Sequence, residues 1–265
     1  MAVNKTYVDV ADGQIHLRYV SGNGKLPTVF LHQTASSSAM YQAVMEQLED
    51  LAPLYALDTP GFGGSYRPPQ APTTEYYVDS LMQAIDALGI EQFNLFGHHT
   101  GAALACELAA KYPQRVRKLG MIGPVQLTEE ERSLWRGSAV KPLTIDAQAT
   151  HLNEVWQRVT HLDQQPIAYP PSAALATREA IDTLIAGDRW HEAYAAVFNQ
   201  DFPAYLAQVQ CPLLMICGEG DVLYPYFQRA AEARPDAQVL ELQAGAYVLD
   251  QEPEYMAQVI REFFQ

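Results

Sequence analysis

The sequence predicts an α/β fold with a mostly parallel sheet, and three observations lead to this prediction. Short apolar runs alternate with segments of helical spacing through most of the 265 residues, as in sheets whose parallel strands are joined by helices. The first two runs flank Asp12 and Gly13 and are expected to form an antiparallel hairpin at the sheet edge. The alternation stops at about residue 125 and resumes after residue 206, which predicts an insertion in one connection.

Before the insertion, strands and helices are expected in regular succession. The hairpin strands are residues 7–10 and 14–20. The later strands are short apolar runs at residues 28–32, 53–57, 92–96 and 116–122. The segments between them have apolar residues at helical spacing, at about residues 40–51, 74–88 and 102–112. This order predicts a sheet with helices in its crossover connections.

Residues 125–206 are expected to form a helical cap over the ends of the strands. Helical segments at residues 147–159 and 172–186 are separated by Pro170 and Pro171, which end any helix. A connection of about 80 residues is too long to lack structure of its own.

After the cap, the strand pattern resumes and completes the sheet. Strands are expected at residues 212–218 and 238–242, with helices at about residues 226–233 and 254–264. The chain is therefore divided into a core of residues 1–124 and 207–265 and a helical cap of residues 125–206.

Composition and charge exclude several classes of protein. The 31 acidic and 17 basic residues give a formal net charge of −14, which repels polyphosphate backbones and argues against nucleic-acid binding. No apolar run reaches the ~18 residues that span a bilayer, and the first residues lack the apolar core of a signal peptide. The three cysteines have no metal-like spacing and suit a reducing compartment. We expect a cytoplasmic monomer or homodimer that acts on a small molecule and does not bind membranes.

Four segments, in this order, resemble the α/β-hydrolase superfamily over nearly the whole chain. They are the loop LHQT, the turn DTPGFGGS, the strand–turn–helix FGHHTG, and the two segments at the ends of the last expected strands, CGEGDVLYP and LQAGAYVLDQEP. The nucleophile elbow of that family, G-x-S-x-G, is a strained strand-to-helix turn that needs small residues at both ends. Gly97 and Gly101 meet this requirement, and His99 stands at the elbow position. The resemblance implies a mostly parallel eight-stranded sheet with flanking helices and an inserted helical cap.

The sequence departs from the family at two positions that would carry its chemistry. A hydrolase of this family would have serine at position 99, a carboxylate near 221 and histidine near 247. Asp221 stands where the carboxylate is expected, but the other two positions hold His99 and Tyr247. All seven histidines precede residue 192, so no downstream histidine can replace the missing one. A serine–histidine–acid relay is therefore excluded.

His99, Tyr247 and Asp221 are the candidate catalytic residues. An imidazole titrates near neutral pH, so His99 can act as a base, an acid or a nucleophile. Tyr247 is a phenol and is expected to donate a proton or to anchor the substrate, because its reference pKa is about 10. Asp221 is expected to accept a hydrogen bond from Tyr247 and to fix its orientation.

The resemblance also implies an oxyanion hole, which is a set of backbone N–H groups that stabilise a developing negative charge. The corresponding positions are Thr100, directly after the elbow, and Gln33 or Thr34 in the loop after the third strand. Ser36 in the same loop is a candidate substrate contact, although serines at such positions commonly cap the next helix. His32 is another candidate contact, and its alternative role is to orient the loop.

Two tryptophans of the cap, Trp135 and Trp156, are candidate pocket residues, although aromatic residues at helical spacing are more often part of a core. His98 is expected to be structural and to pack between sheet and helix. No group of residues has metal-ligand spacing and no glycine-rich phosphate loop is present, so neither a metal nor a nucleotide cofactor is expected.

These residues fit a cofactor-free enzyme that acts on a small organic carbonyl compound by acid–base catalysis. A carbon–carbon lyase, a decarboxylase and a cyclase or isomerase all belong to this class. The first alternative is a hydrolase of an ester, a lactone or a carbon–carbon bond, in which His99 activates water or acts as the nucleophile. The second alternative is a non-catalytic member of the family that binds a ligand.

Overall fold

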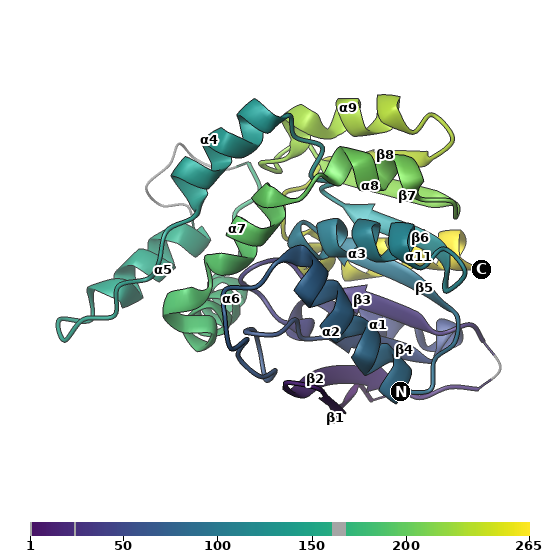
Figure 1. Ribbon diagram of the computed structural model, residues 1–265, viewed down its shortest axis with the longest axis horizontal. Helices are drawn as coiled ribbons and strands as arrows, with labels where there is room; N and C mark the ends of the chain where they lie inside the picture. The colour runs from purple at the N-terminus through teal and green to yellow at the C-terminus, as the bar shows by residue number, and fades with distance from the viewer. Residues whose placement is uncertain (1, 24, 161–167) are drawn as a thin grey trace.

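An eight-stranded sheet forms the centre of the protein in a computed structural model that describes residues 2–23, 25–160 and 168–265 (Figure 1). The strand order is β1-β2-β4-β3-β5-β6-β7-β8. β2 pairs in antiparallel fashion with β1 and with β4, and every later pairing is parallel. The strands are β1 (Asn4–Val10), β2 (Gly13–Val20), β3 (Thr28–Leu31), β4 (Leu54–Leu57), β5 (Phe93–His98), β6 (Val116–Ile122), β7 (Leu213–Gly218) and β8 (Gln238–Leu242). The predicted fold class is confirmed.

The central strands are buried on both faces. Every residue of β3, β5 and β7 is buried, which is typical of parallel strands that helices cover on both sides. Successive side chains point to opposite faces, so Leu95 belongs to the core cluster of one face and Phe96 to that of the other.

Two groups of helices cover these faces. The face with Leu95 packs against α2 (Thr74–Ala87), α3 (Thr100–Lys111), α8 (Phe202–Gln208) and α9 (Tyr224–Ala233). The face with Phe96 packs against α1 (Gln42–Gln47), α10 (Val248–Gln251) and α11 (Pro253–Phe264).

Among the described residues, five α-helices lie between β6 and β7, in the region expected to form the cap. They are α4 (Glu129–Ala139), α5 (Thr150–Thr160), α6 (Ala173–Ala186), α7 (Glu192–Asn199) and α8. Figure 1 shows α4, α5, α6 and α7 gathered at one end of the sheet. α8 instead packs on α3, where the Gln200 amide just before it donates to Glu107 at 2.7 Å. The division into core and cap stays a prediction, and this contact shows where the inserted helices rejoin the sheet.

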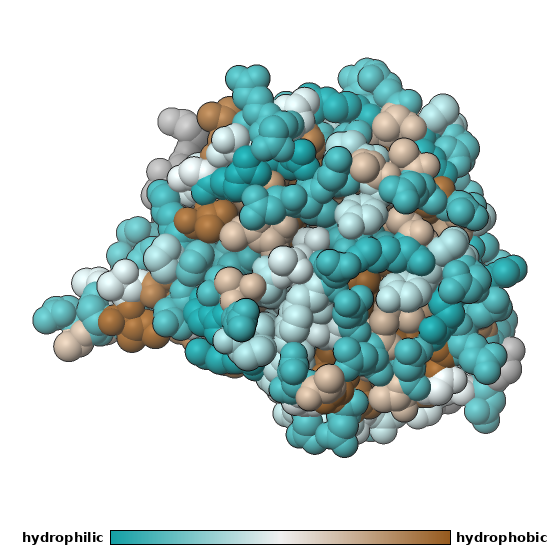
Figure 2. Space-filling view, viewed as in Figure 1, coloured by the Kyte–Doolittle hydropathy of each residue, from teal (hydrophilic) through white to brown (hydrophobic). Residues whose placement is uncertain are grey.

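The face drawn in Figure 2 is mainly polar. Figure 2 shows a largely hydrophilic face with separate hydrophobic patches. Leu134, Ile145 and Leu152 in the inserted region are among the exposed large apolar side chains. In the part of the chain that the structure describes, no helix combines the length and apolarity needed to cross a membrane.

Candidate active site

The turn between β5 and α3 holds His99 in a strained conformation. Its backbone has φ 48° and ψ −109°, and a positive φ is uncommon for a residue other than glycine. The His99 N–H donates to the Ile122 carbonyl at 2.9 Å, and the Ala103 N–H donates to the His99 carbonyl at 2.9 Å. Such strain persists only where the surroundings impose it, and it is concentrated at functional sites.

Two glycines make this turn possible. A Cβ atom at Gly97 would lie 2.3 Å from the Gly101 carbonyl oxygen, and one at Gly101 would lie 2.1 Å from the Leu31 carbonyl oxygen. Strand β5, helix α3 and the end of β3 therefore touch through their backbones. The same contact places the loop after β3, which contains Gln33 and Thr34, beside the first turn of α3.

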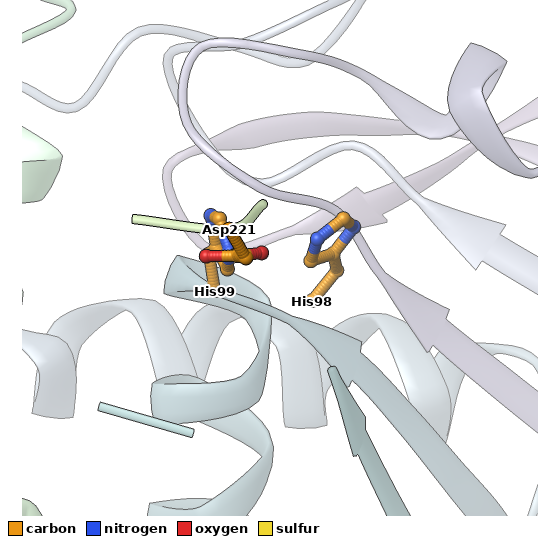
Figure 3. Close-up of side chains that lie close together, drawn as sticks. All are labelled: His98, His99 and Asp221. Atoms are coloured by element: carbon orange, nitrogen blue, oxygen red, sulfur yellow. The ribbon is translucent and has the colours of Figure 1, made fainter. Parts of the chain in front are cut away.

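His99 and Asp221 form a dyad, a term used here for this pair only (Figure 3). His99 Nε2 lies 2.7 Å from Asp221 Oδ2, and the two side chains are 14% and 0% exposed. The second carboxylate oxygen accepts the Leu223 N–H at 2.8 Å. Burial alone would raise the pKa of Asp221, but the His99 imidazole and the hydrogen bonds to the carboxylate lower it. The carboxyl group is therefore ionised at neutral pH.

An ionised carboxylate only accepts hydrogen bonds, so the proton in the 2.7 Å contact belongs to His99 Nε2. In a neutral imidazole, the other nitrogen then carries the lone pair. The dyad thus fixes one tautomer of His99 and leaves Nδ1 as the basic atom. A carboxylate that orients an imidazole in this way also stabilises the imidazolium formed when the base accepts a proton.

The hydrogen bond expected between Tyr247 and Asp221 is a wrong prediction. Tyr247 precedes α10, and its hydroxyl donates to the Val159 carbonyl of α5 at 3.3 Å. An imidazole on the elbow reaches the loop after β7, so Asp221 pairs with His99 and with the Leu223 N–H instead. Burial, more than its charged neighbours, raises the pKa of Tyr247, so the phenol stays protonated.

Gly123, directly after β6, makes space for the His99 ring. It has φ +60°, and a Cβ atom there would lie 2.2 Å from His99 Cδ2 and 2.6 Å from Nε2. Sequence reasoning missed this residue. The only signal was a glycine directly after a strand, in MIGP.

His98 is buried completely, and within the described chain neither of its ring nitrogens has a hydrogen-bond partner. Its ring packs edge-on against that of His99, with the ring centroids 4.5 Å apart. Burial, reinforced by the neighbouring His99, lowers the pKa of His98 well below its ordinary value, so this imidazole is neutral.

An apolar cavity of about 70 Å³ lies beside the dyad. His99 and Thr100 form its polar wall, and the other lining residues are Val125, Trp135, Ala139, Tyr194, Val197, Phe198, Val222 and Leu223. The Trp135 ring stacks on Phe198 at 5.8 Å. Trp135 thus lines a cavity, and its contact with a substrate stays a prediction. Trp156, on α5, is not among the residues that line this cavity.

Two polar residues expected to contact substrate are engaged elsewhere. His32 is buried, with Nδ1 2.8 Å from the Gln33 carbonyl and Nε2 accepting the Thr59 N–H at 2.9 Å. It joins two loops and has no ring nitrogen left for a substrate. Ser36 is 0% exposed and donates to Glu179 of α6 at 2.9 Å. Both are corrected from substrate contacts to supports of the loop that contains Gln33 and Thr34.

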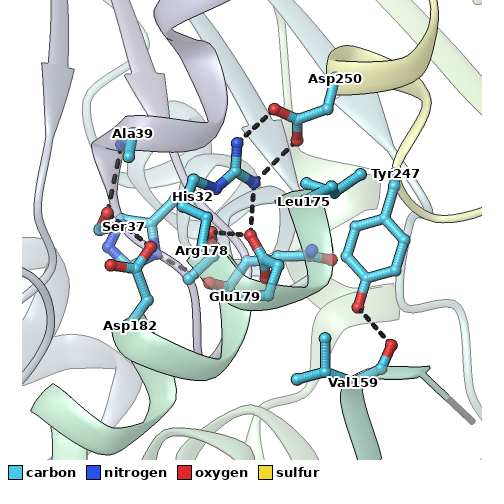
Figure 4. A network of polar contacts seen from close by, with 12 residues as sticks. His32, Ser37, Ala39, Val159, Leu175, Arg178, Glu179, Asp182, Tyr247 and Asp250 are labelled. Carbon is cyan, nitrogen blue, oxygen red and sulfur yellow. Dashed lines mark hydrogen bonds and ion pairs between the residues drawn. The ribbon is translucent and has the colours of Figure 1, made fainter. Parts of the chain in front are cut away.

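The loop after β3 is held by a group of buried and partly buried polar residues that we call the α6 network (Figure 4). It consists of Ser36, Ser37, Arg178, Glu179, Asp182 and Asp250. Arg178 forms ion pairs with Glu179 and Asp250. The Ser37 hydroxyl donates to Asp182 at 2.9 Å and accepts the Ala39 N–H, which caps the following 3₁₀ turn.

Sequence reasoning missed the charged members of this network. Charges at positions 178, 179 and 182 of a helix are usually solvated, whereas here Glu179 and Asp182 are buried. Burial, with a smaller contribution from the nearby Glu179 carboxylate, raises the pKa of Asp182 to about 6. The network fastens α6 to the loop beside the dyad.

A family model for the alpha/beta hydrolase fold matches residues 27–253 of the chain. The chain belongs to this family. A curated relative, the 2-hydroxymuconate semialdehyde hydrolase of Pseudomonas sp. (strain CF600), is 33% identical over 123 residues, which are 43% of this chain and 43% of the relative. The Caenorhabditis elegans protein named "Abhydrolase domain-containing protein abhd-5.2" is 36% identical over 105 residues, 38% of this chain and 23% of that protein. These matches thus span less than half of either curated relative.

Solved structures of other proteins match this chain along nearly its whole length. A hydrolase from Pseudomonas aeruginosa PA01 has a TM-score of 0.82 at 20% identity and covers 98% of both chains. An enol-lactonase from Burkholderia xenovorans LB400 has a TM-score of 0.76 at 18% identity, with 97% of this chain and 99% of the enzyme covered. At this level of identity the likeness establishes the shared fold.

Proposed function

We propose that this α/β-hydrolase-fold protein is a cofactor-independent enzyme that removes a proton beside the carbonyl group of a small organic compound. The observation that carries the proposal is the 2.7 Å contact between His99 Nε2 and the buried Asp221 carboxylate, at the wall of an apolar cavity. A base that is oriented by a carboxylate and partly shielded from water is suited to proton transfer.

The reaction follows from the tautomer that Asp221 fixes. His99 Nδ1 takes the proton from the carbon beside the carbonyl group, and the electron pair of the broken C–H bond forms an enolate. The Asp221 carboxylate stabilises the resulting imidazolium. Backbone N–H groups of Thr100 and of Gln33 or Thr34 stabilise the enolate oxygen.

The enolate then takes up a proton at another position, which is an isomerisation. In the reverse direction, His99 supplies the proton to an enolate that is released by decarboxylation or by carbon–carbon cleavage. Tyr247 is assigned to positioning in this proposal, because its hydroxyl already donates to Val159.

The cavity limits the substrate to a small compound with an apolar arm. A dry cavity of about 150 Å³ holds one benzene molecule, and this one has about 70 Å³. A group of a few carbon atoms therefore fits between Trp135 and Leu223, with the carbonyl group toward Thr100. The apolar walls offer no countercharge for an ionic arm.

Hydrolysis is the second candidate, and the names of the relatives favour it. The curated relative described above is a hydrolase of a semialdehyde, and one of the structural neighbours is an enol-lactonase. In this case His99 Nδ1 would activate a water molecule or attack the carbonyl carbon to form an acyl-imidazole.

Hydrogen–deuterium exchange separates these candidates without knowledge of the native substrate. Butanone and cyclopentanone are incubated with the protein in D₂O, and loss of the proton signals beside the carbonyl group is followed by NMR. We expect the wild type to accelerate the exchange and His99→Gln to lose at least about 100-fold of that acceleration. Hydrolysis of 4-nitrophenyl acetate is measured in parallel, because turnover there without exchange would favour the second candidate.

The control variant is His191→Gln, since His191 lies at the start of α7 and bonds the Asp188 carbonyl. It is expected to match the wild type in both assays. Equal exchange rates for wild type and His99→Gln would contradict the proposal. A wild type inactive in both assays would favour a ligand-binding member of the family.

A further inference from the structure

His98, His99 and Asp221 place three metal-ligating groups around one point (Figure 3). One ligand atom from each residue lies within 4.8 Å of the others. Adjacent residues of a strand normally point to opposite faces. The left-handed conformation of His99 instead brings its ring against that of His98, with the centroids 4.5 Å apart.

His98 supplies a second and independent observation. It is 0% exposed, and both ring nitrogens lack a hydrogen-bond partner among the described residues. Buried polar groups are almost always satisfied, so an exception of this kind needs an explanation. An imidazole nitrogen with a free lone pair beside a second imidazole and a carboxylate is explained by a metal ligand set.

We propose that His98, His99 and Asp221 bind one divalent transition-metal ion of the zinc type, and that the bound ion prevents proton transfer by the dyad. Two imidazoles and one carboxylate suit Zn²⁺, whereas Mg²⁺ and Ca²⁺ require mostly oxygen ligands. Three protein ligands leave a fourth position on the ion for water or another small ligand. The inhibition rests on the proposed function, whereas metal binding itself does not.

The required rearrangement is small. Bonds of about 2.0–2.1 Å in a tetrahedral site place ligand atoms about 3.3 Å apart. The 2.7 Å contact between His99 and Asp221 opens slightly, and the His98 ring turns inward from a cluster that already lies within 4.8 Å. The formal charge of −14 also raises the concentration of cations near the protein.

The bound ion prevents proton transfer by a simple exchange of partners. The metal takes the lone pair of His99 Nε2 and the Asp221 oxygen, and the proton that was on Nε2 passes to Nδ1, because a metal-bound histidine is a neutral imidazole. With a proton on Nδ1, His99 has no lone pair left with which to act as a base. The ion therefore competes with the catalytic state of the dyad and acts as an inhibitor.

The test is a titration of metal-free protein, prepared by chelation and removal of the chelator, with Co²⁺ and with Zn²⁺. Visible d–d bands report the Co²⁺ ligand field, and calorimetry gives the Zn²⁺ affinity and stoichiometry. We expect one ion per chain, bands of a low-symmetry four- or five-coordinate site, and loss of ketone exchange in proportion to occupancy. Failure of the wild type to bind one ion per chain would overturn the proposal.

His98→Asn identifies the site, because His98 has no part in the proposed proton transfer. We expect it to keep the exchange activity of metal-free protein and to bind Zn²⁺ at least about 100-fold more weakly, since even outer-shell partners change affinity by 10–100-fold. His191→Asn is the matched control, with unchanged affinity. Unchanged affinity in a folded His98→Asn would overturn the site.

If His98→Asn does not fold, Asp221→Asn tests the Zn²⁺ affinity in its place, since it also removes one ligand, and the same loss of affinity is expected. The two proposals fail separately. Metal binding by a protein that exchanges no ketone protons contradicts the proposed function alone. Exchange by a protein that binds no metal contradicts this inference alone.

Discussion

Two buried polar groups lie close to the loop after β3, and they differ in what surrounds them. The dyad borders an apolar cavity, and the ion-pair partner of Asp221 within the described chain is His99. In the α6 network, Arg178 is shared between Glu179 and Asp250 while serine hydroxyls bond Glu179 and Asp182. The dyad leaves His99 Nδ1 available to a ligand. In the α6 network, the polar atoms bond one another and join α6 to the core. Burial of charge alone therefore does not point to a candidate active site, whereas a ring nitrogen without a partner beside a cavity does.

The largest effect is expected from a matched pair of substitutions, one in each group. Asp221→Asn removes the carboxylate that fixes the His99 tautomer and should lower the ketone exchange rate by about 10⁴-fold, as the corresponding change does in a catalytic triad. Asp250→Asn makes the same chemical change in the α6 network and should leave the rate within about threefold of wild type. Equal losses in the two variants would remove the distinction between the groups.

The α6 network is expected to determine stability instead. Arg178→Met leaves the buried Glu179 and the partly buried Asp250 without their countercharge and should lower the free energy of unfolding by about 3–5 kcal/mol. Arg261→Met is the control, because Arg261 and its partner Asp50 are 30% and 48% exposed. An ion pair with this exposure contributes about 0–1 kcal/mol to the free energy of unfolding. Urea denaturation of both variants measures the difference, and a similar loss in each would show that the network is no more than a surface ion pair.

Gly123→Ala tests whether the position of the His99 ring matters. The added Cβ atom would lie 2.6 Å from Nε2, so the ring must move away from Asp221, and a displacement of this size costs about 100-fold in rate. Gly89→Ala is the control, with φ +70° and nothing within 4 Å of the new atom. Both variants carry backbone strain of about 1–2 kcal/mol, but only Gly123→Ala should lose activity. Loss of activity in both would assign the effect to stability.

The smallest effect is a dependence of stability on pH. The pKa of Asp182 is raised from 3.8 to about 6, mainly by burial of the carboxyl group and to a smaller extent by the nearby Glu179 carboxylate. The folded protein thus binds this proton more tightly than the unfolded chain, and Asp182 costs stability as the pH rises from about 4 to about 6. Asp182→Asn removes that cost.

The free energy of unfolding of Asp182→Asn, relative to wild type, should therefore increase by about 1–3 kcal/mol as the pH rises from about 4 to about 6, and should stay level above that pH. Chemical denaturation of both proteins at pH 4.5, 6 and 7.5 measures the difference. A difference that does not change with pH, or that favours the wild type at pH 7.5, would contradict the assigned titration.

Much of the fold was predictable because it depends on local pattern. The apolar runs of the central strands and the glycines at positions 97 and 101 each impose a constraint that one short segment reveals. The strained conformation of His99 follows from those glycines together with the strand-to-helix turn. The positions of the strands and of the elbow could therefore be stated before the structure was known.

Long-range contacts were not predictable in the same way. Whether Asp221 bonds Tyr247 or His99 depends on the reach of a side chain across 122 residues of sequence. The burial of Glu179 depends on where α6 lies against the loop after β3, and a charged helix gives no sign of it. Trp135 and Trp156 look alike in sequence, but the orientation of α4 and α5 brings Trp135 alone into the lining of the cavity beside His99.

The tautomer of His99 is the most direct test of the central claim. Long-range ¹H–¹⁵N correlation spectra of ¹⁵N-labelled protein at mildly alkaline pH distinguish protonated from unprotonated ring nitrogens, and His99→Gln assigns the signals among the seven histidines. We expect a proton on Nε2, shifted downfield by the hydrogen bond to Asp221, an unprotonated Nδ1, and loss of the downfield shift in Asp221→Asn. A proton on Nδ1 with a free Nε2, or a spectrum that Asp221→Asn leaves unchanged, would contradict the dyad and the function proposed from it.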